Sequence, residues 1–253
     1  MSGATRWIAG VDLAWGEASS DAVCLLSLRH GRATVAGYAY LHGDAALLGE
    51  LTTRIPARAP ALLAIDAPIV CPNPSGTRPV DREISRRFWR EHAGCHSANA
   101  RLCPRPARIA TALVGRGFAI GHDLARARRL VAEVYPHPAM VRLLRLPRIV
   151  KYKRGPVEVR RAEFAHLQGL LRGLVATEFD FLEIGDETRR LLAEPWSKPV
   201  EDLTDAFFCA LVGLWHVRHR GRRSEVLGSL ESGFVLLPED LRASSSPASL
   251  AYG

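Results

Sequence analysis

The stretch VEDLTDAFFCALVGLW, residues 200–215, constrains the fold of this 253-residue chain more than any other. After Thr204 the run is almost wholly apolar, so the sequence predicts a helix that is buried on all sides. Asp202 and Asp205 stand at the head of this helix, three residues apart and therefore on one face, about 5–6 Å from each other. Because two like charges about 4 Å apart repel by about 4 kcal/mol at an effective dielectric of about 20, we expect a cation between them.

The composition is that of a globular protein. With 47% hydrophobic residues, the chain can bury a substantial core. We expect a single domain over residues 1–240 and a disordered tail over residues 241–253, because RASSSPASLAYG has the composition of disorder. No apolar run approaches the roughly 20 residues that span a bilayer, and the start MSGATRWIAGVD does not resemble a signal peptide. The sequence thus predicts a cytoplasmic protein without a membrane partner.

The chain is basic, with a formal net charge of +8 and a pI near 9.7. A basic surface suits nucleic acid, because arginine and lysine neutralise phosphates. The excess comes from arginine, whereas lysine occurs only at positions 151, 153 and 198. Since this balance also occurs in many proteins that never meet nucleic acid, the charge permits such a partner without requiring it.

The five cysteines are odd in number and scattered, which argues against a disulfide framework. Cys71, Cys95, His96 and Cys103 leave a zinc site open as an alternative. None of their spacings is the close C-x2-C pair that is typical of structural zinc sites, so we expect reduced thiols.

The first third of the chain reads as strands followed by a helix. RWIAGVDLAW (6–15) is an apolar strand that ends in Asp12. The next two strands, 22–29 and 32–41, are separated only by HG and predict an antiparallel hairpin. A helix over about 44–54 and a buried strand, PALLAIDAP (60–68), which ends in Asp66, complete this part.

The remainder of the chain mixes helices, loops and one more strand. Residues 70–128 read as a helical insertion or enlarged crossover, with helical patterns over 80–92 and about 109–130. A strand over 130–138 carries Glu133, and further helices are expected over 139–146, over 162–176 and in the final buried run. Three antiparallel strands followed by strands joined through helices predict an α/β fold with one mixed five-stranded sheet and helices on both faces.

Five carboxylates fall at the ends of these elements, namely Asp12, Asp66, Glu133, Asp202 and Asp205. Strand ends that meet at one sheet edge bring their side chains together in the crevice where open α/β sheets place their sites. Such a cluster needs a cation, and carboxylate oxygens are the ligands that Mg²⁺ and Mn²⁺ prefer. Two such ions about 3.5–4 Å apart can activate water and stabilise the leaving oxygen of a phosphodiester.

Six short motifs occur in the order AGVDLAW, AIDAPIV, RPVDREISRR, AEVYPHP, VKYKRG and DLTDAFFCA. Together they resemble a family of predicted RNase H-like nucleases that is catalogued as a domain of unknown function, over roughly residues 8–238. Similarity to the RuvC-like resolvase branch of this fold implies that Asp12, Asp66, Asp202 and Asp205 bind the metal ions. One departure is Asp66, since resolvases of that branch usually carry a glutamate on this strand.

The resemblance implies a metal-dependent nuclease that hydrolyses phosphodiester bonds of DNA or RNA with Mg²⁺ or Mn²⁺. In this hypothesis Asp12 bridges both ions, Asp66 and the final-helix pair complete their coordination, and Glu133 assists as a further ligand or as an acceptor behind the ligands. Resolvase-like enzymes commonly work as dimers, so a homodimer is left open. The residues expected to meet substrate phosphates are Arg78, Asp81 and Arg86 at a helix start, and Lys151 and Lys153 in a loop.

Other functions are compatible with the same residues. A non-catalytic nucleic-acid or nucleotide binding module would keep the fold with a degraded site, and a hydrolase of a small phosphorylated metabolite would use the same acids. A kinase-like phosphotransferase is disfavoured because no glycine-rich phosphate loop follows the first strand.

Several of these residues also suit purely structural roles. Asp202 suits the positive end of a helix dipole, and Asp12 and Asp66 suit turns after strands. Glu133 has arginines nearby in sequence, Arg129 and Arg142, with which it could pair. A role in catalysis or base stacking is open, but a bystander or packing role is favoured, for His92, His96, His137, Trp15 and Trp89.

Overall fold

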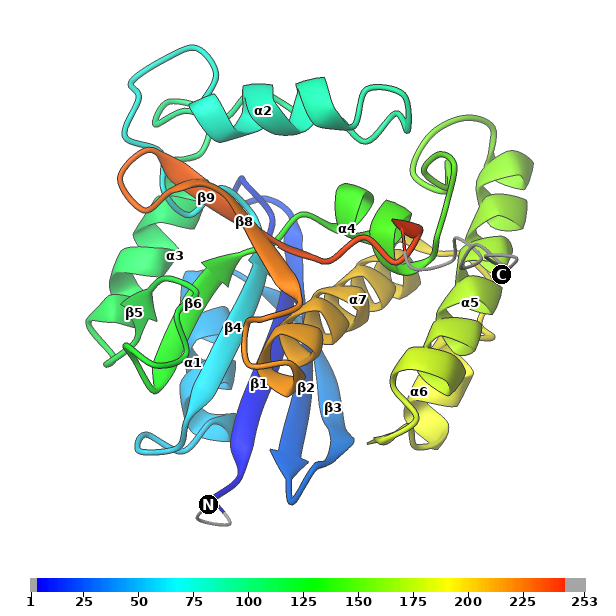
Figure 1. Ribbon diagram of the computed structural model, residues 1–253, viewed down its shortest axis with the longest axis horizontal. Coiled ribbons are helices and arrows are strands. Elements are labelled where there is room, and N and C mark those ends of the chain that lie inside the picture. The colour runs from blue at the N-terminus through cyan, green and yellow to red at the C-terminus, as the bar shows by residue number, and fades with distance from the viewer. Residues whose placement is uncertain (1–3, 244–253) are drawn as a thin grey trace, which may run out of the picture.

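The centre of the fold is one mixed β-sheet of seven strands flanked by helices, an α/β architecture (Figure 1). The structure is a computed structural model that describes residues 4–243. The order of strands across the sheet is β5-β6-β4-β1-β2-β3-β7. These strands are β1 (Arg6–Asp12), β2 (Ser20–Arg29), β3 (Arg32–His42), β4 (Ala61–Asp66), β5 (Ala119–Ile120), β6 (Arg129–Glu133) and β7 (Leu182–Glu183).

The antiparallel half of the sheet confirms the predicted hairpin. β1 pairs with β2, and β2 pairs with β3, both in antiparallel register. The turn between β2 and β3 consists of His30 and Gly31, both with positive φ, of 49° and 81°. Turns with two residues of positive φ match the twist of the flanking strands, which explains why two residues suffice here.

The parallel half of the sheet aligns the strand ends that carry acids. β4 lies beside β1 and β6 lies beside β4, both in parallel register. β1, β4 and β6 end in Asp12, Asp66 and Glu133, as the sequence predicts. Because parallel strands share one direction, these three residues reach the same edge of the sheet.

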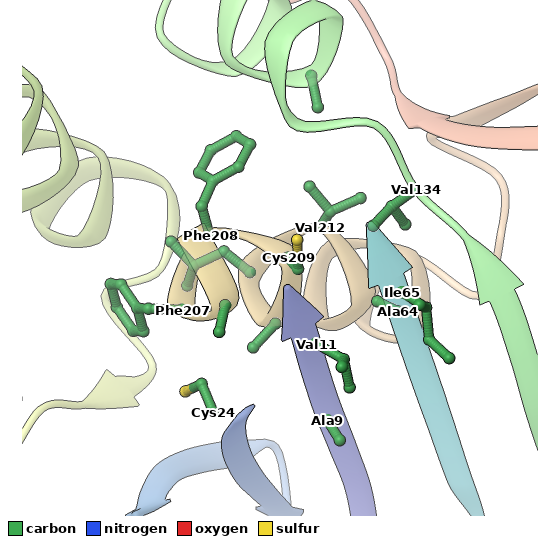
Figure 2. Close-up of a cluster of buried hydrophobic side chains, with 14 of the residues drawn as sticks. Ala9, Val11, Cys24, Ala64, Ile65, Val134, Phe207, Phe208, Cys209 and Val212 are labelled. Carbon is green, nitrogen blue, oxygen red and sulfur yellow. The ribbon is translucent and has the colours of Figure 1, made fainter. Parts of the chain in front are cut away.

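Seven helices join and cover the strands of the described chain. α7 packs on β1, β2 and β4, while α1 and α3 pack against each other. Figure 2 shows α7 crossing β1 and β4, with its Cys209 and Val212 among buried apolar side chains. The helices are α1 (Asp44–Arg54), α2 (Pro79–Arg87), α3 (Pro104–Val114), α4 (Pro136–Leu143), α5 (Val157–Glu178), α6 (Asp186–Leu191) and α7 (Lys198–Arg218).

α7 lies so close to the sheet that two contact positions have no room for a side chain. A Cβ atom on Gly10 would stand 2.1 Å from both the Ala206 carbonyl oxygen and the Ala210 amide nitrogen. On the helix, a Cβ atom on Gly213 would stand 2.8 Å from Ile8. Glycine at both positions therefore allows the backbone of α7 to rest on β1.

The number of strands predicted from the sequence is wrong. The main sheet has seven strands rather than five, because the short strands β5 and β7 extend its two edges. A separate two-stranded sheet, β8 (Ser224–Ser229) and β9 (Gly233–Pro238), was also missed. β9 is buried at every position, so it shows none of the alternation that marks a half-exposed strand.

Several element bounds also differ from the prediction. The helical pattern expected to reach residue 130 ends with α3 at Val114, because Gly117 follows with a φ of 83°. The strand expected over 130–138 ends at Glu133, and the helix expected from Ala139 begins at Pro136, since proline is tolerated in a first helical turn. α2 ends at Arg87 rather than at residue 92. The expected disordered tail lies almost wholly outside the described residues.

The final helix is confirmed, but it begins earlier than the two acids suggest. α7 starts at Lys198 after Ser197, so Asp202 lies in its second turn. Because the effect of the helix dipole falls off within the first turn, it does not explain the presence of Asp202.

Within residues 4–243, no helix combines the length and the apolar character that crossing a membrane would require.

The close contact between β1 and α7 predicts that Gly10→Ala destabilises the protein. The added methyl group forces α7 away from β1, and overpacking of this kind costs about 1–3 kcal/mol. Gly49→Ala is the matched control, because nothing lies within 4 Å of a Cβ atom at this exposed position in α1. Gly49→Ala should stabilise by about 0.5–1 kcal/mol through helix propensity. Urea denaturation measures both, and equal stability of the two variants would contradict the proposed role of Gly10.

Candidate active site

Asp12 and Asp66 lie side by side and face α7. They are directly paired in the parallel register of β1 and β4. Side chains alternate along a strand, so Asp12 shares the face of Gly10, which touches α7. Within residues 4–243, no group donates a hydrogen bond to either carboxylate. The two carboxylates therefore keep their oxygen atoms available for a ligand.

Asp205 brings a third carboxylate to the same place from α7. It lies one residue before Ala206, whose carbonyl packs on Gly10, and its side chain has no exposed surface. The Tyr152 hydroxyl donates a 2.6 Å hydrogen bond to Asp205 Oδ1. The Lys153 ammonium lies 2.7 Å from Oδ2, and this ion pair is the only partner of that buried oxygen within the described residues.

Lys153 is the cation among these three carboxylates. Burial alone would lower the pKa of its ammonium group, but Asp205, Asp12 and Asp66 raise that pKa well above its usual value. Lys153 therefore stays charged at neutral pH. Its side chain is 32% exposed, so the ammonium group reaches the acids from the surface of the molecule.

One ammonium group does not compensate all three acids. Burial raises the pKa of Asp12 well above its usual value, Lys153 opposes the rise, and the Asp205 and Asp66 carboxylates add to it. Burial likewise raises the pKa of Asp66 to about 7, again against the effect of Lys153. The acids thus favour a further positive charge, from a proton or a metal ion.

Asp202 lies beside the three-carboxylate group, with partners of its own. Lys198 donates a 2.6 Å hydrogen bond to Asp202 Oδ1, and the Tyr40 hydroxyl donates a 3.2 Å bond to Oδ2. Its charge is close enough to contribute to the raised pKa of Asp12. Asp202 therefore lies at the edge of the site, and its negative charge is compensated by Lys198, one turn earlier in α7.

Glu133 belongs to a different, buried cluster. The register pairs Glu133 with Ile65, so its side chain leaves the sheet on the face opposite to Asp66. Arg78 donates hydrogen bonds of 2.8 and 2.6 Å to its two carboxylate oxygens, and the Ile69 amide donates a third. The same guanidinium also pairs with Asp81. Glu133 thus lies on the other face of the sheet from Asp66 and has partners of its own, although its charge still contributes to the raised pKa of Asp66.

This cluster also holds two of the residues expected to bind phosphate. Arg78 and Asp81 are 2% and 1% exposed, so their side chains are committed to the interior. The pairing partner of Glu133 is Arg78, rather than Arg129 or Arg142 from the neighbouring sequence. A cavity of about 60 Å³ between Asp66 and Glu133 has room for about two water molecules.

The other basic residues expected to meet phosphate lie on the surface. Arg86 and Lys151 are exposed. The Arg154 guanidinium, in the loop of Lys153, lies 3.3 Å from His96 Nε2. Burial, Lys153 and His96 lower the pKa of His137 to about 3, so its ring is neutral and a weak proton acceptor at neutral pH.

The oxygen atoms of the three carboxylates are chemically suited to a hard divalent cation. Their present arrangement, however, does not form a complete metal-binding site. Asp12, Asp66 and Asp205 offer only carboxylate oxygens, the ligands suited to Mg²⁺ and Mn²⁺. As arranged, residues 4–243 contain no group of three or more acidic, histidine or cysteine side chains set to hold an ion. This finding applies equally to the zinc alternative at Cys71, Cys95, His96 and Cys103. Lys153 Nζ lies where a cation would contact Asp205.

Sequence reasoning did not identify the groups that hold these acids in place. Lys153 was expected to meet phosphate, and Tyr152 was only part of a family motif. Tyr152 and Asp205 are 53 residues apart in sequence, so no spacing signals their contact. By contrast, the pairing of Lys198 with Asp202 follows helical i, i+4 spacing and is visible in the sequence once the helix start is known.

A comparison with protein families finds a match to the model described as "Protein of unknown function (DUF429)", over residues 10–231. The match covers β1 to β8 and includes all the carboxylates described above. No curated protein and no solved structure matches the chain.

The raised pKa of Asp66 predicts that Asp66→Asn gains stability relative to wild type as the pH rises. Below about pH 4 this carboxyl is protonated in both folded and unfolded chains and has no cost. Between about pH 4 and 7 the folded state keeps a proton that the unfolded chain releases, so wild-type stability falls with pH. Asparagine does not titrate, and the variant should gain about 1–3 kcal/mol over wild type between pH 4 and 8, since coupled carboxylates share the cost.

Urea denaturation in the presence of a chelator measures this difference at each pH. Asp180→Asn, at an exposed acid outside the site, is the control and should show no such trend. If the stability gain of Asp66→Asn over wild type stays constant or shrinks as the pH rises, the pKa of Asp66 is not raised in the folded state.

Proposed function

The chain belongs to the DUF429 family, and from this premise we propose that it is a metal-dependent nuclease with an RNase H-like fold. Its substrate is the phosphodiester bond of DNA or RNA. The observation that carries the proposal is the pairing of Asp12 and Asp66, which face Asp205 without a hydrogen bond from any described group. Such a set of half-buried and buried acids with incomplete charge compensation is typical of a functional site rather than of a structural one.

Asp12, Asp66 and Asp205 would hold Mg²⁺ or Mn²⁺. When bound, such an ion lowers the pKa of a bound water and stabilises negative charge on the phosphate oxygens. The chain itself fixes the acids: the β1–β4 register sets Asp12 against Asp66, and Tyr152 orients Asp205. Since His137 is neutral and weakly basic, it is a poor general base.

Lys153 has two roles in this proposal. Without an ion it pairs with Asp205 and compensates part of the negative charge of the acids. This ammonium group would be repelled by a metal ion held by the acids, and it could then contact a substrate phosphate. Gly155, with a φ of 102°, and the exposed neighbours Lys151 and Arg154 place this loop at the surface, where it can meet a phosphate.

The arrangement of strands supports the RNase H-like part of the proposal. The sequence pattern predicts three antiparallel strands followed by strands joined through helices, and the resemblance assigns this order to an RNase H-like fold. β1, β2 and β3 are antiparallel, and β4 and β6 follow in parallel beside β1. The acids of β1, β4 and α7 are those that the resemblance assigns to metal binding.

A second candidate is a nucleic-acid or nucleotide binding module without catalysis. It is favoured by Lys153, because a lysine that permanently neutralises the acids would leave no need for a metal ion. This candidate predicts no metal binding, and substrate affinity that survives the loss of Asp12.

The proposal predicts that Mn²⁺ binds to the wild-type protein and that Asp12→Asn and Asp66→Asn each abolish this binding. Each variant removes one charged ligand from the Asp12–Asp66 pair that faces Asp205. Isothermal titration calorimetry measures the binding, and a mixed pool of short DNA and RNA strands reports cleavage. Asp180→Asn is the matched control and should bind Mn²⁺ as wild type does. A wild-type protein that binds no Mn²⁺ would favour the binding module, and binding without cleavage would favour a small phosphorylated substrate.

The double role of Lys153 predicts opposite effects of Lys153→Met on metal and substrate. Removal of the competing ammonium group should raise the Mn²⁺ affinity at least about tenfold, or about 1.4 kcal/mol. Cleavage should fall, because the cation that meets the substrate phosphate is lost. The exposed neighbour provides the control, Lys151→Met, which should leave the Mn²⁺ affinity unchanged. Weaker Mn²⁺ binding in Lys153→Met would contradict the competition between lysine and metal.

A further inference from the structure

A large basic cleft lies at the end of the sheet opposite to the acids. Its volume is about 1180 Å³. Its walls come from the start of β1, the residues before β4 and β6, the β2–β3 turn and the C-terminal end of α7. Figure 1 shows the start of β1 and the β2–β3 turn at this end of the sheet. We call it the arginine cleft, after the five arginines that line it: Arg6, Arg128, Arg218, Arg220 and Arg222.

The arginine cleft is separate from the candidate active site. α7 runs from one to the other, with Asp205 near its beginning and Arg218 as its last residue. At 1.5 Å per residue, these two positions are about 20 Å apart along the helix axis. No lining residue of the cleft contributes to the acidic site.

The charge of the cleft is poorly compensated by the protein. Its lining includes one acid, Asp123, and that carboxylate already pairs with Arg126. Within residues 4–243, neither Arg128 nor Arg222 forms an ion pair, and both are exposed. Arg218 lies over the ring of Phe181, and among the described residues it forms no ion pair with an acid. Like charges gathered in a concave surface attract anions strongly.

Arg6 adds an unsatisfied donor to this surface. Its Nη1 atom is buried and has no hydrogen-bond partner within the described residues. Burial and the charge of Arg128 lower the pKa of the Arg6 guanidinium. A buried donor without an acceptor is costly, so an anionic oxygen that reached Arg6 would be stabilised.

The cleft also offers apolar surface beside the arginines. Leu28, Val217 and Val226 line it together with Pro60 and Leu124. A ligand that combines several phosphate oxygens with a flat, largely apolar group would satisfy both parts of the lining. Arginine forks suit phosphate oxygens bidentately, and an aromatic base can pack on aliphatic side chains.

From these observations we propose that the arginine cleft binds a nucleoside polyphosphate. The phosphate chain lies among Arg6, Arg128 and Arg222, and the base packs on the aliphatic wall. A terminal phosphate reaches the buried Arg6 more readily than a phosphate within a nucleic-acid strand, which carries a nucleotide on both sides.

Calorimetric titration of ATP into the full chain, in the presence of a chelator, tests this site without metal ions. We expect ATP to bind wild type, and the double variant Arg128→Ser/Arg222→Ser to lose at least about tenfold in affinity. Inorganic triphosphate should bind more weakly than ATP, because it cannot use the aliphatic wall. Both substituted arginines are exposed, so the double variant should keep the thermal stability of wild type.

Two further variants distinguish binding in the arginine cleft from a general effect of charge and from binding at the acids. Arg161→Ser removes an exposed arginine on α5 and should leave ATP affinity unchanged. Asp12→Asn should also bind ATP as wild type does, so that failure of the proposed nuclease activity leaves this result intact. Absence of ATP binding to wild type, or unchanged binding in the double variant, would overturn the proposal. So would binding of a short single strand of DNA through these arginines without binding of ATP, which would identify a strand-binding surface.

Discussion

The contact between Gly10 of β1 and the backbone of α7 is the constraint on which the rest of the structure depends. With no Cβ atom at position 10, the Ala206 carbonyl and the Ala210 amide lie directly on the strand. This fixes the height and rotation of a helix that is buried along nearly its whole length. Asp205 precedes Ala206 in the chain, so the same contact sets the third carboxylate against Asp12 and Asp66.

The three carboxylates are held together by strand register and helix packing rather than by mutual attraction. Strand register fixes Asp12 beside Asp66, and helix packing fixes Asp205, whereas Lys153 reaches the group from a surface loop. Lys153 is therefore the member of this group that lies neither on a strand nor in α7. In the proposed function, a divalent ion would take the place of this ammonium group while the sheet and α7 stay as they are.

The parts of the site that the sequence predicted are those that depend on local structure. Asp12, Asp66 and Glu133 are predicted at strand ends because each interrupts an apolar run, and the structure confirms all three positions. Convergence was a separate inference, and among the strand-end acids it holds for Asp12 and Asp66, which Asp205 of α7 joins. Glu133 pairs in register with Ile65, one position away from Asp66, and this single step sends its side chain to the opposite face, toward Arg78. Register between strands is a long-range property that no local pattern contains.

The sequence by itself determined the α/β class, the β2–β3 hairpin, the buried final helix and the acids at strand ends, because these follow from hydrophobic periodicity and turn chemistry. Only the tertiary structure decided the seven-stranded sheet, the β8–β9 hairpin, the partners of each acid and the gathering of arginines around the start of β1. Two-residue strands such as β5 and β7 are too short to leave a periodic pattern. Arg6, Arg128 and Arg222 come from three distant segments, and they meet because parallel strands begin at the same edge and α7 ends there.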